Sequence, residues 1–357
     1  MDRSIPILIP AYEPDERMLG LLETLIPTGC YVVIVDDGSG VEYASLFEKA
    51  SEMLGENGHV LHHEVNKGKG RALKTGFSYI LENMPEASGV VTADSDGQHV
   101  AEAISEVSDT LKENPECLIM GVRSFDREDI PWKSSFGNKI TIKVMSFVTG
   151  IKTSDTQTGL RGIPRSFMEK LLKVRGERFE FEMEMLVESA GKYKIIEVSI
   201  PTIYDSKESH QTHFRPVRDS IKIYKVFGRK ILKFIISSLS SAVLDILLFM
   251  LFCNLLKDKS PVWYVTISTV AARIISATYN YLINYIFVFK SEENMGKAAV
   301  KYATLACCQM GLSAGATTLI FWLTHGNETV IKLIVDTVLF IISYKIQQSS
   351  VFAKKHS

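Results

Sequence analysis

The 357-residue chain has almost no net charge and few cysteines, and both shortages exclude functions. Forty basic and 41 acidic residues leave a formal net charge of −1, so no overall basic field favours a nucleic-acid partner. The cysteines lack metal-ligand spacing, and Cys307 and Cys308 are adjacent in an apolar run. We therefore expect neither zinc nor disulfides, and interpret the five cysteines as small buried hydrophobic residues: Cys30, Cys117, Cys253, Cys307 and Cys308.

The chain also shows no signal peptide and no evident catalytic triad. Only about five apolar residues lie between Met1-Asp2-Arg3 and Pro10, too few for the apolar region of a secretory signal. The N-terminal domain is therefore expected on the cytoplasmic side of a membrane.

The first 210 residues alternate short apolar runs with segments of helical spacing. This pattern predicts an α/β domain whose mostly parallel sheet is covered by helices on both faces. Strands are expected over 5–10, 31–35, 59–63, 89–93 and 117–122. Helices are expected over 19–25, 43–54, 70–84 and 101–111. Polar residues follow the strands at their carboxyl ends, where ligands bind in such sheets.

One strand leads into Ala93-Asp94-Ser95-Asp96-Gly97-Gln98-His99. Two carboxylates one residue apart suit a hard divalent cation that also holds a diphosphate. Each motif has a structural alternative when taken alone. Asp-x-Asp occurs by chance, Asp36-Asp37-Gly38-Ser39 is an ordinary turn with a helix N-cap, and 67–71 is a basic loop before a helix.

The order and spacing of six motifs resemble the family 2 glycosyltransferases of the GT-A fold. More narrowly, they resemble the dolichyl- or polyprenyl-phosphate glycosyltransferases, the group of dolichol-phosphate mannose synthase. The resemblance covers about residues 4 to 225. The motifs are Pro10-Ala11-Tyr12-Glu13, Val35-Asp36-Asp37-Gly38-Ser39, Asn66-Lys67-Gly68-Lys69-Gly70, 94–99, 155–161 and Phe179-Glu180-Phe181-Glu182. One departure is Pro14 after Glu13, where the family often has Asn after Pro-Ala-Tyr and then Glu.

The resemblance implies a role for each motif. Asp94 and Asp96, with Gln98 as a neutral oxygen ligand, would hold Mg²⁺ or Mn²⁺ against the diphosphate of a nucleotide sugar. Base and ribose would be held by Pro10, Ala11, Tyr12, Glu13 and Asp37. Lys69 and Arg71 would meet a phosphate or the ribose, or would only start a helix. The remaining implied contacts are Arg123 with the acceptor phosphate, Asp155 and Gln157 with the sugar, and Arg215 and Arg218 with phosphates or lipid headgroups.

The implied chemistry needs no protein base. A lipid monophosphate is mostly dianionic at neutral pH, since its second pKa is about 6. It could attack the anomeric carbon directly, with inversion, so positioning and charge neutralisation would carry the catalysis.

The last 130 residues have the composition of a membrane domain. Residues 218–233 form a basic amphipathic pattern, typical of a helix in the headgroup plane; the alternative is a helix packed on the soluble domain. Four spans are expected over 234–253, 262–289, 302–323 and 330–346. Asp245, Arg273 and Asp336 should face the bundle interior, either as an Asp245–Arg273 structural pair or to move lipid substrates.

A faint repeat and the distribution of lysines add to this picture. The segment 284–289 is echoed by 347–352, which predicts two copies of a two-helix hairpin in parallel orientation. Residues 230–353 resemble the GtrA-type four-helix membrane domain. Lysine and arginine before the first span, between the second and third, and at the end of the chain place both termini in the cytoplasm.

The expected organisation is a GT-A domain over 1–214, an interface helix over 215–233 and a GtrA-like domain over 234–357. The expected function is inverting transfer of a hexose from a UDP- or GDP-sugar to undecaprenyl or dolichyl phosphate, for cell-envelope glycosylation. Its partners are thus a nucleotide sugar, a polyprenyl phosphate and a membrane, and a homo-oligomer is compatible with the sequence. Two alternatives remain. One is a processive polysaccharide synthase, which usually carries a Gln-x-x-Arg-Trp motif that this chain lacks, and the other is a non-catalytic lipid carrier or flippase.

Overall fold

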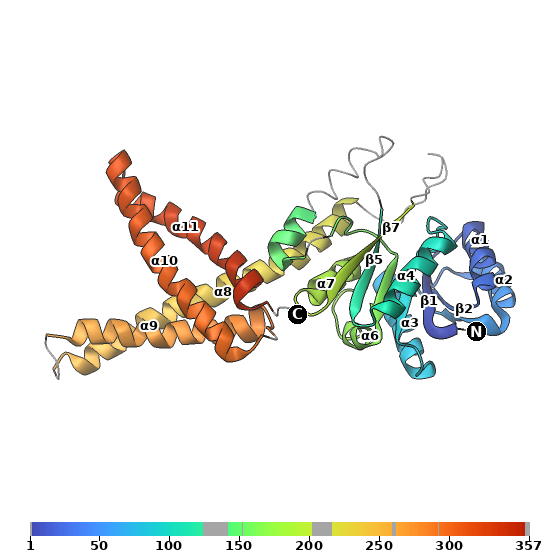
Figure 1. Ribbon diagram of the computed structural model, residues 1–357, viewed down its shortest axis with the longest axis horizontal. Coiled ribbons are helices and arrows are strands. Elements are labelled where there is room, and N and C mark those ends of the chain that lie inside the picture. Colours follow the sequence, from blue (N-terminus) through green and yellow to red (C-terminus); the bar gives the residue numbers. More distant parts are fainter. Residues whose placement is uncertain are drawn as a thin grey trace. The chain divides into compact units, whose positions relative to one another are not determined.

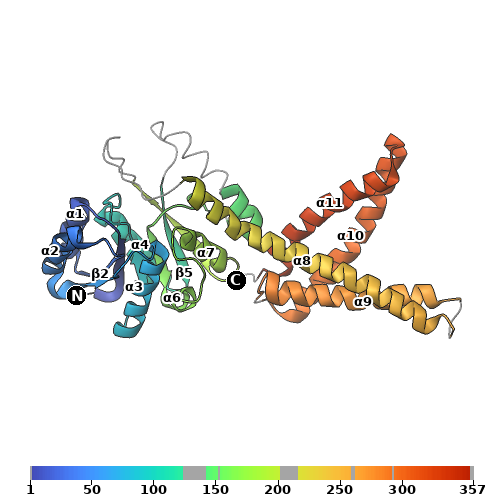
Figure 2. The same cartoon turned by 180° about the vertical axis from the view of Figure 1, so that it is seen from behind.

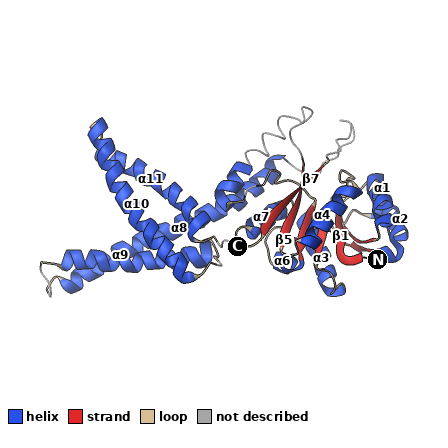
Figure 3. Cartoon of the chain, in the orientation of Figure 1, coloured by secondary structure: helices blue, strands red, loops and turns tan. Residues whose placement is uncertain are grey.

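The computed structural model describes residues 2–123, 142–151, 153–201, 216–258, 262–291 and 293–353. They fall into two compact units, one of residues 1–146 and 151–226, the other of 147–150 and 227–357. Figures 1 and 2 show the chain from opposite sides, and Figure 3 marks its helices and strands. The first unit is α/β and the second is helical, which confirms the expected fold classes.

The first unit is built on a seven-stranded sheet in the order β3-β2-β1-β4-β6-β5-β7. Neighbouring strands are parallel except β6, which is antiparallel to β4 and β5. All five expected strands are present, whereas β6 and β7 were not expected. The strands are β1 (Asp2–Ala11), β2 (Cys30–Asp36), β3 (Gly58–His62), β4 (Gly89–Thr92), β5 (Cys117–Arg123), β6 (Arg161–Pro164) and β7 (Lys194–Ile200).

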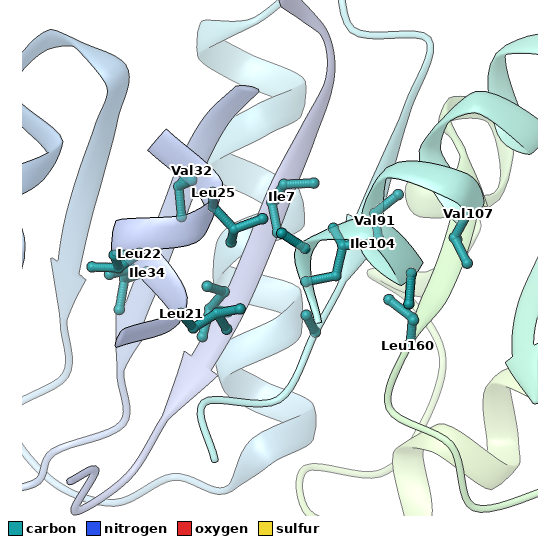
Figure 4. Close-up of a cluster of buried hydrophobic side chains, with 14 of the residues drawn as sticks. Ile7, Leu21, Leu22, Leu25, Val32, Ile34, Val91, Ile104, Val107 and Leu160 are labelled. Atoms are coloured by element: carbon teal, nitrogen blue, oxygen red, sulfur yellow. The ribbon is translucent and has the colours of Figure 1, made fainter. Parts of the chain in front are cut away.

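Helices cover both faces of this sheet, as a parallel sheet requires. The helices of this unit are α1 (Glu16–Leu25), α2 (Ala44–Leu54), α3 (Lys69–Asn83), α4 (Ala101–Glu113), α6 (Arg165–Leu171) and α7 (Glu180–Ser189). A further helix over 142–149 lies where the chain passes between the two units. Because side chains alternate along a strand, Ile7 faces the side chains of α1 and α4 in the buried cluster of Figure 4. On the other face, α3 packs against β1 and β2.

The second unit is built from four long helices, of which the first begins in the first unit: α8 (Pro216–Leu256), α9 (Tyr264–Ile283), α10 (Met295–Thr324) and α11 (Glu328–Ile346). Among the residues described, two stretches are long and apolar enough to cross a membrane, Lys225–Leu256 of α8 and all of α10. The amphipathic segment and the first expected span thus form one continuous helix. The count of four spans stays a prediction.

The predicted repeat has a structural counterpart. Helices α9 and α11 each continue into a π-helical turn, Asn284–Val288 and Gln347–Val351. The equivalent residues meet, because Asn284 Nδ2 donates to Gln347 Oε1 across 3.1 Å in a buried contact. The rings of Phe289 and Phe352 stack with their centroids 5.0 Å apart. The two halves of the repeat therefore join at equivalent positions.

The charged residues of the second unit are only partly as expected. The Asp245–Arg273 pair is confirmed, with Nη2 and Oδ2 3.2 Å apart. Asp336 pairs instead with Lys332, at 2.9 Å. The side chains of Arg273 and Asp336 are 68% and 46% exposed in the single chain, so the expectation that both face the interior is wrong. Lys332 and Asp336 are four residues apart on α11, so their charges pair along the helix surface without entering the bundle.

The interpretation of all five cysteines as buried is also wrong. Cys307 and Cys308 are exposed on α10, and the other three are only half-buried; all five are free thiols. An apolar helix has no need to bury its small side chains when its surroundings are apolar as well.

Candidate active site

The loops after β1 and β2 are tied together by a chain of hydrogen bonds. The amide of Glu13 donates to Ser39 Oγ at 2.8 Å, and Ser39 Oγ donates to Asp36 Oδ1 at 2.7 Å. Gly38 has a positive φ of 74°, and a Cβ there would lie 2.3 Å from the carbonyl carbon of Val65. Only glycine therefore lets the loop after β3 approach this turn so closely.

Asp37 organises that loop from the inside. Its side chain is buried, and its carboxylate accepts from the amides of Lys67 (3.0 Å) and Gly68 (2.7 Å) and contacts His63 Nδ1 at 2.8 Å. Both oxygens are thus engaged within the protein. A contact from Asp37 to ribose remains a prediction and would have to share these oxygens. Tyr12 lies half-buried beside it, and a hydrogen bond to Glu13 raises the pKa of the Tyr12 hydroxyl.

The acidic motif follows β4 and lies next to the first residue of α3. Lys69 Nζ is 2.7 Å from Asp94 Oδ1 and 3.0 Å from Glu182 Oε1. His99 is buried, with its Nε2 3.7 Å from Asp94 Oδ2. The amide of Gln98 donates to Asp96 Oδ1 at 3.1 Å, which closes the turn. The Lys69 ammonium therefore lies against one oxygen of Asp94, and the His99 imidazole lies near the other.

The two carboxylates of the motif titrate differently. Burial alone would raise the pKa of Asp94, but the Lys69 ammonium and His99 outweigh it and hold that pKa below its usual range. Burial, followed by repulsion from Asp94, raises the pKa of Asp96. Burial would lower the pKa of Lys69, but Asp94 and Glu182 raise it, so the ammonium stays charged. Asp96 is thus the carboxylate whose charge is least compensated by the protein.

The unexpected strand β6 supplies the other wall of the site. Because β6 is antiparallel, the loop that precedes it lies at the carboxyl edge of β4. A Cβ at Gly159 would fall 2.2 Å from Asp94 Oδ2, so the backbone of this loop passes directly against the carboxylate. Thr92 Oγ1 fixes the approach by donating to the Gly159 carbonyl at 2.8 Å.

Arg161, the first residue of β6, is 1% exposed and joins this loop to α7 through hydrogen bonds to backbone carbonyls of both. Its Nε donates to Thr158 O at 3.0 Å and its Nη1 donates to Glu182 O at 2.8 Å. Burial lowers the pKa of Arg161 from its ordinary value. Arg161, Glu182 and His99 were given no role from the sequence, although all three lie in motifs that carried the resemblance.

Arg123 and Asp155, predicted for different substrates, form one bidentate pair. Arg123 Nε and Nη2 donate to Asp155 Oδ2 and Oδ1 at 2.7 and 3.2 Å, and Asp155 is fully buried. The amide of Gln157 donates to Asp155 Oδ1, while the Gln157 residue is exposed. A buried carboxylate thus fixes the guanidinium at the end of β5.

The other predicted cations differ in how far the structure describes them. Arg71 Nε lies 2.6 Å from Glu177 Oε2, which favours the structural alternative for this residue. Arg215 lies outside the described residues, and for Arg218, in α8, only the backbone is described. Pro10 and Ala11 end β1 beside β2, where Pro10 pairs with Val35 and Ala11 with Asp36.

The site suits a divalent cation. Within the part of the chain that the structure describes, no three His, Cys, Asp or Glu side chains converge as a complete cage. Two carboxylates plus substrate phosphates are nevertheless the usual set for Mg²⁺. Asp94 already attracts a cation, since the Lys69 ammonium lies against it, and Asp96 has the least compensated charge. Asp94, Asp96 and Gln98 would hold the ion.

Comparison with known proteins defines the class. Residues 7–172 match the profile of glycosyl transferase family 2, and residues 224–352 match that of the GtrA/DPMS transmembrane domain. The chain is therefore a glycosyltransferase in which a family 2 domain precedes a GtrA/DPMS membrane domain.

Curated relatives are similar over about half of this chain. The polyprenol monophosphomannose synthase of Mycolicibacterium smegmatis is 25% identical over 54% of this chain and 75% of its own length. The undecaprenyl-phosphate 4-deoxy-4-formamido-L-arabinose transferase of Proteus mirabilis is 27% identical over 47% of this chain and 51% of its own length. Among solved structures, S. aureus TarS 1-349 aligns with 97% of this chain and 90% of its own at 14% identity and a TM-score of 0.41, a similarity too low to bear on function.

Proposed function

We propose that this chain transfers a hexose from a UDP- or GDP-sugar to a polyprenyl phosphate, with inversion, at the cytoplasmic face of a membrane. The product would be a lipid-phosphate-linked sugar for cell-envelope glycosylation. The observation that carries the proposal is the edge of the sheet where Asp94 and Asp96 follow β4 and Arg123 ends β5. The GtrA/DPMS domain in the same chain supplies the reason for a lipid acceptor.

Different residues of the first unit would bind the different parts of the donor and the acceptor. The loops after β1 and β2, with Tyr12 and Glu13, would receive the base and ribose of the donor. A cation bound by Asp94 and Asp96 would supply neutralisation of the charge that grows on the leaving nucleoside diphosphate. Arg123, fixed by the buried Asp155, would bind the acceptor phosphate and align it with the anomeric carbon. The phosphate oxygen attacks as a dianion, so no protein group needs to remove a proton.

The membrane unit would keep the acceptor's polyprenyl chain near the site. Four membrane spans, with both termini cytoplasmic, remain part of this proposal. The ion pair between Asp245 of α8 and Arg273 of α9 supports a folded helical unit.

The test is transfer by the purified full chain in detergent. The chain is incubated with Mn²⁺, a short polyprenyl phosphate and a panel of UDP- and GDP-sugars, and lipid products are identified by mass spectrometry. A single added hexose, lost with Asp94→Ala or Asp96→Ala, is the expected result. Lipid bearing many sugars would instead support a processive synthase. No donor consumption with any sugar would support a non-catalytic carrier.

A further inference from the structure

The ammonium of Lys69 lies on a carboxylate that the proposed cation needs. Lys69 Nζ is 2.7 Å from Asp94 Oδ1 and 3.0 Å from Glu182 Oε1, and the three side chains are 19%, 30% and 15% exposed. The contact joins the start of α3, the loop after β4 and the first turn of α7, three segments far apart in the sequence. The contact therefore depends on the tertiary structure and is not a local ion pair within one helix.

An ammonium and a divalent cation that contact the same carboxylate compete for its negative charge and repel each other. Like charges at such a distance repel strongly, and more so where solvent is partly excluded. The cation would also reach Asp94 from a restricted direction, because the loop at Gly159 closes one side of both carboxylate oxygens: an added Cβ there would lie 2.2 Å from Oδ2 and 2.5 Å from Oδ1. Repulsion from a cation bound to Asp94 therefore favours release of Lys69 from that oxygen.

We infer that Lys69 is an exchangeable counter-ion: it neutralises Asp94 in the resting enzyme and is released when the cation arrives with the donor. Glu182 keeps one end of the contact, so the ammonium can turn about it toward the donor diphosphate. The released ammonium thereby exchanges one anionic partner for another. This inference rests on the proposed function for the identity of the donor.

The chemistry of lysine suits this exchange. Its ammonium is a point charge on a flexible stem, with three donors that can be redistributed between partners. Without a second carboxylate, its release from Asp94 would leave a half-buried cation unpaired, which is costly. The consequence is positive coupling: cation and nucleoside diphosphate each bind weakly alone and more tightly together.

The first test measures Mn²⁺ binding without nucleotide, from the free-ion signal in electron paramagnetic resonance. Lys69→Met should tighten Mn²⁺ binding by about tenfold, within the usual range of coupling between sites. Lys69→Arg keeps a cation on Asp94 and should bind Mn²⁺ as weakly as the wild type. Glu182→Gln removes the second partner of Lys69 and should weaken Mn²⁺ binding further. Lys67→Met removes an exposed charge from the same loop and serves as the matched control, with no change expected.

The second test measures the binding of UDP and GDP by calorimetry, in EDTA and in Mg²⁺. Because Lys69 is engaged by Asp94 when no cation is bound, Lys69→Met should leave nucleotide affinity in EDTA unchanged. In Mg²⁺ the same substitution should weaken nucleotide binding, since the released ammonium is missing. A lysine that only binds phosphate would weaken both equally.

The inference is overturned if Lys69→Met leaves Mn²⁺ affinity unchanged or lowers it, or if it weakens nucleotide binding equally in EDTA and in Mg²⁺. The unfolding temperature of each variant identifies loss of fold, and Lys69→Arg then decides, because tighter Mn²⁺ binding by this variant would also refute the exchange. Neither test involves transfer to lipid. Failure of the transfer assay with an intact binding cycle would overturn the proposed function and leave the role of Lys69 standing.

Discussion

Replacing Gly159 by alanine tests the claim that the loop before β6 sets the position of Asp94. An added Cβ would lie 2.2 Å from Asp94 Oδ2 and 2.5 Å from Oδ1. Ordinary contacts begin at 3.4 Å, so the carboxylate and the loop must separate by 1.2 Å. The loop has little freedom to yield, because Thr92 and Arg161 hold its carbonyls.

The expected consequences follow from that displacement. A shift of about 1 Å at a reacting group can cost about 100-fold in rate, and altered support of a metal ligand about 10- to 100-fold in metal affinity. We expect Gly159→Ala to lower kcat about 100-fold and to weaken Mn²⁺ binding about tenfold. The overpacking should lower the free energy of unfolding by only about 1–3 kcal/mol, so the variant should remain folded.

The assay compares sugar transfer, Mn²⁺ affinity and unfolding temperature with those of Gly20→Ala. Gly20 lies inside α1 with no atom within 4 Å of an added Cβ, so alanine there should leave activity unchanged and raise stability by about 0.5–1 kcal/mol. If Gly159→Ala shows wild-type kcat and Mn²⁺ affinity, the proposed dependence of the site on this contact is refuted.

Three further predictions concern stability. At neutral pH, Asp94→Asn should lower the unfolding temperature by an amount equivalent to about 1–3 kcal/mol, because it leaves Lys69 short of a partner, whereas Asp96→Asn should raise that temperature. Arg161→Met leaves buried carbonyls without a donor, so it should cost about 3 kcal/mol or more in urea unfolding and also lower kcat/KM. Asn284→Ala should lower the thermal stability of the chain in detergent by about 0.6–1.7 kcal/mol, because Gln347 Oε1 loses its donor.

The sign of the pH dependence separates the two aspartates. The pKa of Asp94 is lowered in the folded state, so its stabilising contribution is present above the unfolded pKa of about 3.9 and is lost as pH falls through the folded value. The pKa of Asp96 is raised, so its ionisation destabilises the fold above about pH 3.9 and the gain from Asp96→Asn should vanish in acid. Equal effects of the two asparagine variants at pH 7 would contradict this assignment. For Arg161 and Asn284, unchanged stability would show that water or a neighbour replaces the lost donor.

Much of the fold was predictable because its signals are local. Five strands and four helices of the first unit follow from apolar periods that each span fewer than about 20 residues. Strand β6 was not predicted, because four residues that begin with arginine and glycine carry no period of their own. Its place between β4 and β5 depends on partners far away in the chain.

The sequence by itself determined the two-part architecture, the acidic motif after β4 and the echo between 284–289 and 347–352, since each is written in neighbouring residues. Only the tertiary structure decided that Lys69 pairs with Asp94 and Glu182, that Arg123 and Asp155 form one pair, and that Gly159 lies against Asp94. These contacts join residues 25 to 113 positions apart in the chain. The distances between these residues are set by how the strands and helices pack, and no local sequence pattern specifies that packing.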